Sequence, residues 1–251
     1  MQANGLTIRR FATPERAASS LARDIAQALA TTPQLVLGLP TGRTPVPLYA
    51  ALVSLYERGQ ANFSRASTFN LDEFLGVPPT DPRSYRAFME RQLFDVVNLR
   101  PSRIHFLSGA APDAEAECAR YERAIGRAGG IDLLILGLGV NGHIGFNEPG
   151  RALVAGTHRT RLTAATRRSN VSLFGRVADV PTEALSMGMG TILRARRIVL
   201  LATGAAKAPT VRQMVVGPIT AQVPASFLQL HRAAEVWVDR DAASELSEDV
   251  R

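Results

Sequence analysis

The feature that most constrains the fold of this chain is a repeated alternation of short apolar segments with longer amphipathic ones. The apolar segments predict strands, at residues 6–11, 34–39, 66–70, 103–107, 131–136, 197–202 and 235–239. The amphipathic segments predict helices, at residues 14–30, 45–58, 84–96, 114–128 and 205–216. Strands that alternate with helices pair in parallel, so the sequence predicts an α/β fold. We expect a doubly wound, mainly parallel sheet with helices on both faces.

We expect a single domain over residues 1–251, with the most apolar segment, residues 131–136, as its central strand. An apolar fraction of 46% and a charged fraction of 20% are typical of a soluble globular protein. A looser, lid-like region is expected at about residues 151–180, where six arginines precede the first acidic residue, Asp179. Such a basic stretch is most often solvated surface or a subunit contact, although it could also border a phosphate site.

Composition also limits the classes of function. The single cysteine, Cys118, excludes a disulfide framework within the chain and a cysteine-rich metal site. No apolar run reaches membrane-spanning length, and residues 1–5 lack the features of a signal peptide, so we expect a cytoplasmic protein with no membrane partner. The formal charge of +7 favours anionic ligands, but the arginines are scattered, which argues for a small anion and against nucleic acid. A homo-oligomer stays open.

Ligands of doubly wound sheets bind at the carboxyl ends of the strands, so the loops that follow strands carry the candidate site. The first such loop contains Thr41, Gly42, Arg43 and Thr44 and leads into a helix opened by Pro45. A glycine beside a helix N-terminus suits the close approach of an anion. An ordinary helix start fits this loop equally well, and the loop lacks the Gly-Lys-Ser/Thr of a Walker motif.

Two further loops carry single candidates. Asp72 and Glu73 follow the third strand, and a carboxylate there could act as a general base, although a capping aspartate or a solvated turn is the commoner arrangement. Lys207 follows the glycine turn after residues 197–202 and is the only lysine of the chain. A lysine in the first turn of a helix opposes the helix dipole, so a bound anion would favour its position.

The remaining loop follows the central strand and contains a formal G-x-G-x-x-G at residues 137–142. Pro149 prevents the helix that a dinucleotide site needs, so we expect no dinucleotide. The Asn-Gly pair also fits a hairpin turn. Asn141, His143 and Glu148 place an imidazole close to a carboxylate, which suits proton transfer near neutral pH. With no second histidine or cysteine nearby, we expect no metal.

Four motifs occur in a fixed order: Leu-Pro-Thr-Gly-x-Thr-Pro, Phe-Asn-Leu-Asp-Glu, Asn-Gly-His-Ile-Gly-Phe-Asn-Glu-Pro and Gly-x-x-Lys-Ala. Together they closely resemble the glucosamine-6-phosphate deaminase family, over a region from about Phe11 to Asp239. The third motif is highly specific, and the others gain meaning from their order. The resemblance implies a reaction without a cofactor, in which glucosamine 6-phosphate and water give fructose 6-phosphate and ammonia.

The resemblance also implies roles for individual residues. Asp72 resembles the base that moves a proton between C2 and C1 of the sugar. His143 resembles the acid and base of ring opening, tuned by Glu148 and by Asn141, which can orient the imidazole through a hydrogen bond. Lys207 and the Thr-Gly-Arg-Thr loop resemble the phosphate site.

Two departures from the family pattern affect the phosphate site. Arg43 stands where a glycine is usual, and the arginine that members often supply near Ser172 is absent. Our hypothesis is that Arg43 replaces it, since a guanidinium can bind phosphate through two hydrogen bonds. Arg167 or Arg168 could serve instead.

Three other functions remain open at this point. A deaminase for galactosamine 6-phosphate is the nearest, because a sequence cannot separate epimers. A 6-phosphogluconolactonase shares the fold and a Gly-His segment but needs no base for a C2 proton, which Asp72 would be. A sugar-phosphate sensor without catalysis usually carries a DNA-binding module, and we expect no room for one before Leu6.

Overall fold

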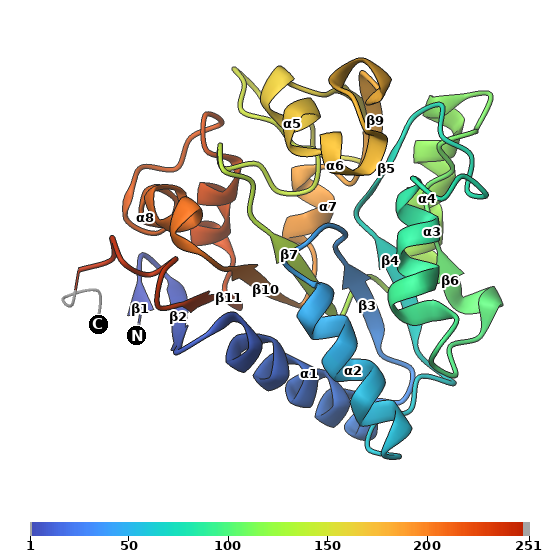
Figure 1. Ribbon diagram of the computed structural model, residues 1–251, viewed down its shortest axis with the longest axis horizontal. Helices are drawn as coiled ribbons and strands as arrows, with labels where there is room; N and C mark the ends of the chain where they lie inside the picture. The colour runs from blue at the N-terminus through green and yellow to red at the C-terminus, as the bar shows by residue number, and fades with distance from the viewer. Residues whose placement is uncertain (1, 248–251) are drawn as a thin grey trace.

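The computed structural model describes residues 2–247 and consists mainly of one eight-stranded sheet (Figure 1). Its strands are β1 (Gln2–Ala3), β2 (Leu6–Phe11), β3 (Val36–Leu39), β4 (Ser67–Asn70), β6 (Ile104–His105), β7 (Leu133–Gly137), β10 (Arg197–Ala202) and β11 (Ala234–Asp239). Their order is β1-β2-β11-β10-β7-β3-β4-β6. Only β1 pairs antiparallel, so the predicted mainly parallel sheet is confirmed, with β7 in its interior.

Helices cover both faces of this sheet, as predicted. One face carries α1 (Pro14–Thr31) and α2 (Val46–Glu57), which lie side by side (Figure 1), together with α3 (Tyr85–Met89) and the π-helical turn Glu90–Phe94. The other face carries α4 (Ala114–Arg127), α7 (Met189–Leu193) and α8 (Ala208–Val216). No helix of the described residues is long and apolar enough to cross a bilayer.

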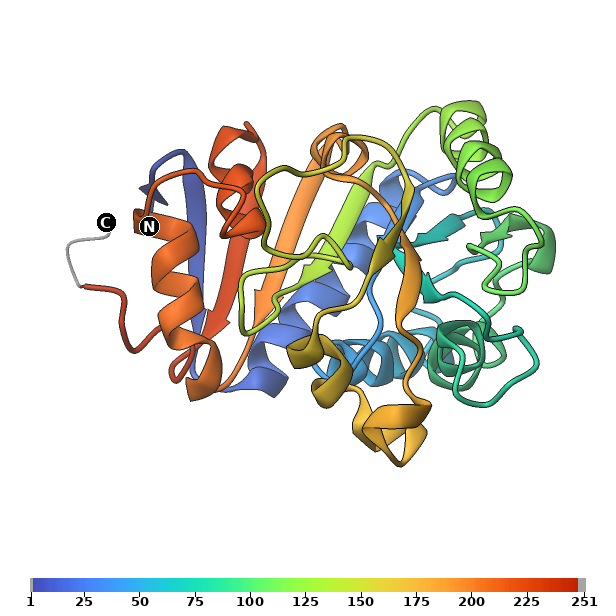
Figure 2. The ribbon, with the colours of Figure 1, turned by 90° about the horizontal axis from the view of Figure 1, so that it is seen from above.

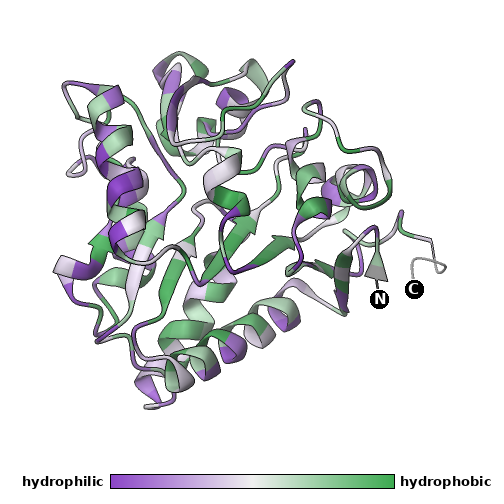
Figure 3. Cartoon of the chain, turned by 180° about the vertical axis from the view of Figure 1, so that it is seen from behind, coloured by the Kyte–Doolittle hydropathy of each residue, from purple (hydrophilic) through white to green (hydrophobic). Residues whose placement is uncertain are grey.

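Strand β7 shows how the sequence fills both layers. Successive side chains of a strand point to opposite faces. Leu133 and Ile135 therefore enter the core under α1 and α2, while Leu134 and Leu136 enter the core under α4 and α8. All four are at most 3% exposed, which explains why this segment is the most apolar of the chain. Figure 3 shows the strands of the sheet as the most hydrophobic part of the ribbon.

A second, three-stranded antiparallel sheet was not predicted. It contains β5 (Asp72–Phe74), β8 (His158–Arg161) and β9 (Glu183–Ser186), in the order β5-β9-β8. Together with α5 (Ala164–Ser169) and α6 (Val171–Phe174) it forms a layer beside the ends of the main strands, which Figure 2 shows from above. The expectation of a loop at Asp72 was therefore wrong. Residues 151–180, expected to be loose, contain one strand and two short helices.

Other predicted elements differ only at their ends. The strand expected at residues 103–107 shortens to β6, and the helix expected at 84–96 divides into α3 and a π-helical turn. Pro45 is the residue before α2, which begins at Val46 without a side-chain cap. The helix expected from residue 205 starts as a single 3-10 turn, Ala205–Lys207, before α8.

Candidate active site

The loops at the carboxyl ends of β3, β7 and β10 surround one cavity of about 610 Å³. Its lining includes eight of the nine residues predicted to form the site: Thr41, Gly42, Arg43, Thr44, Asp72, Asn141, His143 and Lys207. The ninth, Glu148, lies behind His143. The fold therefore brings together four segments that are far apart in the sequence, at the sheet edge where ligands of this architecture bind.

Asp72 is the first residue of β5 and is 7% exposed. Its carboxyl makes no hydrogen bond or ion pair with the described residues, so no contact compensates for the loss of solvation of the charged form. Burial, followed by the nearby charge of Glu73, raises the pKa of Asp72 to about 8. A carboxylate with such a pKa is a stronger base than an exposed one, as the removal of a proton from carbon requires.

The glycine of the His-Ile-Gly-Phe segment lets the histidine loop approach Asp72. Gly145 has a φ of +56°, and a Cβ there would lie 3.6 Å from Oδ2 of Asp72 and 3.1 Å from Oγ of Ser186. Oγ of Ser186 also accepts a 3.0 Å hydrogen bond from the backbone N–H of Phe146. The loop that carries His143 therefore packs closely against the strand pair β5–β9, which carries Asp72.

His143 lies at the cavity wall with Glu148 behind it. Nδ1 of His143 is 3.6 Å from Oε2 of Glu148, which is longer than a hydrogen bond. Burial raises the pKa of Glu148, but the side chains of His143, Thr166 and Asn141 lower it by a larger amount, and the net pKa is about 2. Glu148 is therefore a carboxylate at neutral pH, able to stabilise a positive charge on the imidazole.

Asn141 acts differently from the sequence expectation. Its Nδ2 donates to Oε2 of Glu148 at 2.9 Å, and its Oδ1 accepts from the backbone N–H of His143 at 3.3 Å. The expectation that Asn141 hydrogen-bonds the imidazole was therefore wrong. The amide instead braces the carboxylate and the main chain, because a side chain two residues before the histidine reaches its N–H more readily than its ring.

The second glycine of the Gly-x-Gly pattern provides space for the imidazole. A Cβ on Gly139 would lie 2.4 Å from Nδ1 and from Cε1 of His143. The backbone N–H of Gly139 also donates to the carbonyl oxygen of His143 at 2.9 Å. The Gly-x-Gly pattern, which formally matches a dinucleotide fingerprint, thus leaves room here for the histidine ring.

Replacing Gly139 with alanine is accordingly expected to lower kcat by about 10²-fold, the loss typical of a catalytic group misplaced by about 1 Å. The added methyl group displaces the ring of His143, while the fold is kept. Steady-state kinetics on the proposed substrate below measure the loss. Gly126→Ala on α4 is the matched control, because a Cβ there meets nothing within 4 Å. Full activity in Gly139→Ala would contradict this packing.

Two cationic side chains, those of Arg43 and Lys207, also line the cavity. Gly42 turns the loop before α2 with a φ of +97°, a conformation that favours glycine. The side chains of Arg43 and Lys207 form no hydrogen bond or ion pair with any of residues 2–247. Burial, followed by the charge of Arg43, lowers the pKa of Lys207. Two cations that face one cavity with no acidic partner, beside the uncapped N-terminus of α2, form an arrangement suited to a dianion.

The structure also locates Ser172, near which an arginine is absent, and the two alternative phosphate ligands, Arg167 and Arg168. Ser172 lines the cavity where family members often carry an arginine. Arg167 does not reach the cavity, because its guanidinium donates to the carbonyl oxygens of Val177 and Val180 at 2.7 to 3.3 Å. Arg168 is exposed and is not part of the lining.

Sequence reasoning missed Tyr85, Thr163 and Thr166. Thr163 is the N-cap of α5 and donates to Oε1 of Glu148 at 3.3 Å, and Thr166 also donates to that oxygen. Tyr85 lines the cavity and is 8% exposed. The Thr-x-x-Thr pattern could have indicated the cap, but not the partner 15 residues earlier in the chain.

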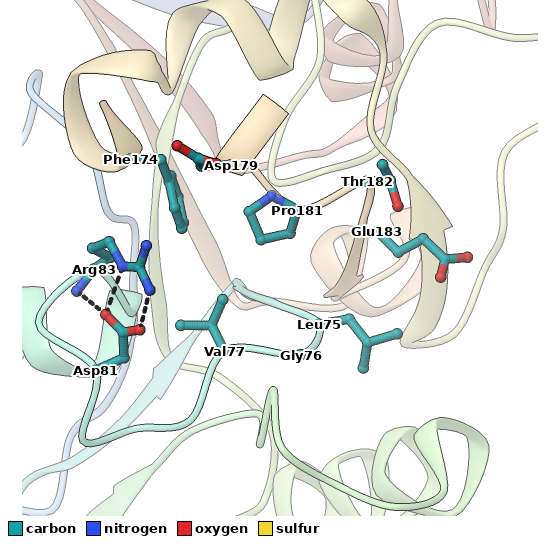
Figure 4. Close-up of a pocket in the computed structure, with 10 residues that line it drawn as sticks. All are labelled: Leu75, Gly76, Val77, Asp81, Arg83, Phe174, Asp179, Pro181, Thr182 and Glu183. Atoms are coloured by element: carbon teal, nitrogen blue, oxygen red, sulfur yellow. Dashed lines mark hydrogen bonds and ion pairs between the residues drawn. The ribbon is translucent and has the colours of Figure 1, made fainter. Parts of the chain in front are cut away.

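A second pocket, of about 440 Å³, lies between the segment of residues 75–83 and the segment of residues 174–183 (Figure 4). None of the predicted site residues lines it. Oδ2 of Asp81 pairs with Arg83 at 2.6 Å, and the Arg83 guanidinium lies 5.4 Å from the ring centre of Phe174. The pocket therefore lies at the packing interface between α6 and the loop after β5. No cluster of three or more His, Cys, Asp or Glu side chains among the described residues could hold a metal ion.

Known proteins resemble this chain over most of its length. Residues 10–237 match the family model described as glucosamine-6-phosphate isomerases/6-phosphogluconolactonase. The chain is 50% identical to a glucosamine-6-phosphate deaminase of Hahella chejuensis, over 93% of this chain and 89% of that protein. It is 47% identical to one of Halothermothrix orenii, over 88% of this chain and 91% of that protein.

A solved structure of a monomeric glucosamine-6-phosphate deaminase superposes with a TM-score of 0.93 at 40% identity, covering 96% of this chain and 100% of that one. A 6-phosphogluconolactonase from Thermotoga maritima superposes with a TM-score of 0.74 at 20% identity, covering 94% and 100%, which shows a shared fold alone. The predicted fold and resemblance are thus confirmed, and the chain belongs to the glucosamine-6-phosphate isomerase/6-phosphogluconolactonase family.

Proposed function

We propose that this chain converts glucosamine 6-phosphate and water into fructose 6-phosphate and ammonia. The observation that carries the proposal is that one cavity holds two sets of groups. The first is a buried carboxyl of high pKa, Asp72, together with the His143–Glu148 pair. The second is the pair of cations Arg43 and Lys207, whose side chains have no acidic partner among the described residues. The curated relatives named above carry the same activity in their names.

The chemistry follows from these two sets of side chains. Arg43 and Lys207 bind the phosphate and hold the sugar in the cavity that Asp72 lines. His143 opens the ring by moving the proton of the C1 hydroxyl to the ring oxygen, and Glu148 stabilises the imidazolium that forms on the way. Asp72 then removes the proton from C2 and returns it to C1, while one proton of the amine passes to the C1 oxygen. The aldehyde and amine thereby become a C1 alcohol and a C2 imine. Water adds to C2 and ammonia leaves. The sequence of steps is redox-neutral.

A lactonase makes less use of the site. Hydrolysis of a lactone needs an activated water but no proton transfer between two carbons. The burial of Asp72 and its pKa of about 8 suit proton transfer between two carbons. Asp72 therefore favours the deaminase over the lactonase.

The proposal extends to partners and location. The expected partner is a phosphosugar, because the cations Arg43 and Lys207 have no acidic partner among the described residues. We keep the absence of a nucleic-acid partner as part of the same proposal, because the arginines are scattered along the sequence. A cytoplasmic location is likewise kept as a proposal.

The direct test measures ammonia release from glucosamine 6-phosphate and from galactosamine 6-phosphate, with 6-phosphogluconolactone hydrolysis as a third assay. We expect the highest kcat/KM with glucosamine 6-phosphate. A preference for the galactosamine epimer would reassign the substrate, and hydrolysis of the lactone without ammonia release from either sugar would refute the deaminase.

Arg43 is proposed as the substitute for the arginine missing near Ser172. The engagement of Arg167 with carbonyl oxygens and the exposure of Arg168 leave Arg43 as the arginine that lines the cavity beside Lys207. Its guanidinium can bind two phosphate oxygens at once.

Replacing Arg43 with alanine is expected to raise KM for the phosphosugar by about 10- to 100-fold, the equivalent of one charged hydrogen bond. Because the phosphate is bound alike in the ground and transition states, kcat should change little. Arg168→Ala, outside the cavity, is the matched control. An unchanged KM in Arg43→Ala would remove Arg43 from the phosphate site.

A further inference from the structure

Glu73 is a buried carboxylate that the proposed mechanism does not use. It is 1% exposed, it does not line the cavity, and no cation pairs with it within residues 2–247. We propose that Glu73 is a positioning residue of the deaminase: it fixes the strand of Asp72 to the start of α3 and keeps a negative charge behind the Asp72 carboxyl. This inference rests on the function proposed above.

The geometry of Glu73 is that of a backbone anchor. Its Oε1 accepts from the N–H of Phe74 at 2.9 Å and of Tyr85 at 3.0 Å, and its Oε2 accepts from the N–H of Arg86 at 2.9 Å. The first donor belongs to β5, and the other two belong to the first turn of α3. Adjacent residues of a strand point to opposite faces, so Asp72 faces the cavity while Glu73 faces the helix.

The anchor also places Tyr85 over the cavity. The ring of Tyr85 is stacked on Phe146 of the histidine loop, with centroids 5.9 Å apart and planes at 14°. The Tyr85 hydroxyl donates to Oδ1 of Asn170, next to α6, at 3.2 Å. Glu73 thus supports a contact that links β5, the histidine loop and the segment opposite Asp72.

The three N–H donors favour the carboxylate form of Glu73, whereas Asp72 accepts no hydrogen bond from the described residues. Burial raises the pKa of both carboxyls, but the three N–H donors lower that of Glu73 alone, so Glu73 ionises first. The side chain of Arg86 does not neutralise it, because Nε of Arg86 pairs with Glu90 at 2.7 Å. Asp81 adds a further negative charge on the Glu73 side.

Three buried phenols near Asp72 are neutral at neutral pH because burial raises their pKa values: Tyr49 of α2, Tyr85 of α3 and Tyr121 of α4. Besides Asp72 and Tyr85, the charged or titratable groups of the cavity wall are Arg43, His143 and Lys207, none of which is an acid. The negative charge that raises the pKa of Asp72 is that of Glu73, and it opposes ionisation of Asp72.

The test compares pH profiles of kcat/KM for ammonia release in wild type, Glu73→Gln and Glu73→Asp. In wild type the rate rises with pH through about 8, because only the carboxylate of Asp72 can accept the C2 proton. Glutamine keeps the length and removes the charge, and its one carbonyl oxygen can accept at most two of the three N–H donors. We expect the midpoint of its acidic limb to fall by about one pH unit. Aspartate keeps the charge but is too short for all three donors, so kcat should fall with the midpoint unchanged.

Glu117→Gln is the matched control. Glu117 is also a buried glutamate that accepts a backbone N–H, from Ser108 at 2.7 Å, but it lies on α4 and not on β5. Its replacement should leave the midpoint where it is in wild type. An unchanged midpoint in Glu73→Gln, or an equal shift in Glu117→Gln, would overturn the inference. If Glu73→Gln does not fold, a shifted midpoint in Glu73→Asp would overturn it. The absence of ammonia release in wild type would instead refute the proposed function.

Discussion

Asp72→Asn is expected to lower kcat for ammonia release by about 10²- to 10⁴-fold, the range typical of the loss of a general base. An amide has nearly the same shape as a carboxyl but cannot accept the proton of C2. Because the carboxyl of Asp72 is buried and makes no hydrogen bond with the described residues, asparagine leaves no partner unpaired. KM should change little, since Arg43 and Lys207, and not Asp72, are proposed to bind the phosphate.

Exchange of the C2 hydrogen with solvent deuterium provides a second measurement of Asp72. In wild type the exchange should accompany turnover, and in Asp72→Asn it should disappear together with ammonia release. Asp113→Asn is the control, because Asp113 is the N-cap of α4 and asparagine caps a helix equally well. A kcat for Asp72→Asn above a tenth of wild type would show that another group moves the proton.

His143→Gln is expected to lower kcat by a similar factor, about 10²- to 10⁴-fold, because glutamine can form hydrogen bonds but cannot exchange protons near neutral pH. Glu148→Gln should show a smaller loss, since Glu148 acts through the imidazole and lies behind it. The order of the two losses checks the assignment, measured as kcat at saturating substrate.

The residual activity of His143→Gln shows whether His143 acts in ring opening or in a later step. If His143 serves ring opening, the variant should still convert the small open-chain fraction of the sugar, and C2 exchange should proceed at the rate at which that fraction forms. His158→Gln is the control, because the His158 ring contacts the carbonyl of Gly156 outside the cavity. A larger loss in Glu148→Gln than in His143→Gln would contradict these roles.

Most of the main sheet could be predicted from local pattern. Residues 133–136 are apolar at every position because both faces of β7 are covered, and residues 6–11 and 197–202 match β2 and β10 at both ends. The loops after these strands carried the candidate residues because parallel strands all end at one edge. The resemblance to a known family supplied the roles of Asp72 and His143, which no spacing alone would have given.

The small sheet could not be predicted, for a physical reason. β5 has three residues, too few to show a period of two, and its partner Glu183–Ser186 lies more than a hundred residues later in the chain. The same holds for Glu73, whose donors at Tyr85 and Arg86 belong to a helix start twelve residues away. Contacts set by tertiary packing leave little trace in local sequence.

The hydrogen bond from Thr166 to Glu148 has a consequence for motion. Thr166 belongs to α5 and lines the cavity, while Glu148 sits behind the imidazole of His143. Any outward displacement of α5 removes a donor that keeps Glu148 ionised, and so weakens the support of the imidazolium. By linkage, protonation of Glu148 favours the displaced helix to the same extent. The position of α5 and the ionisation of Glu148 are therefore thermodynamically linked.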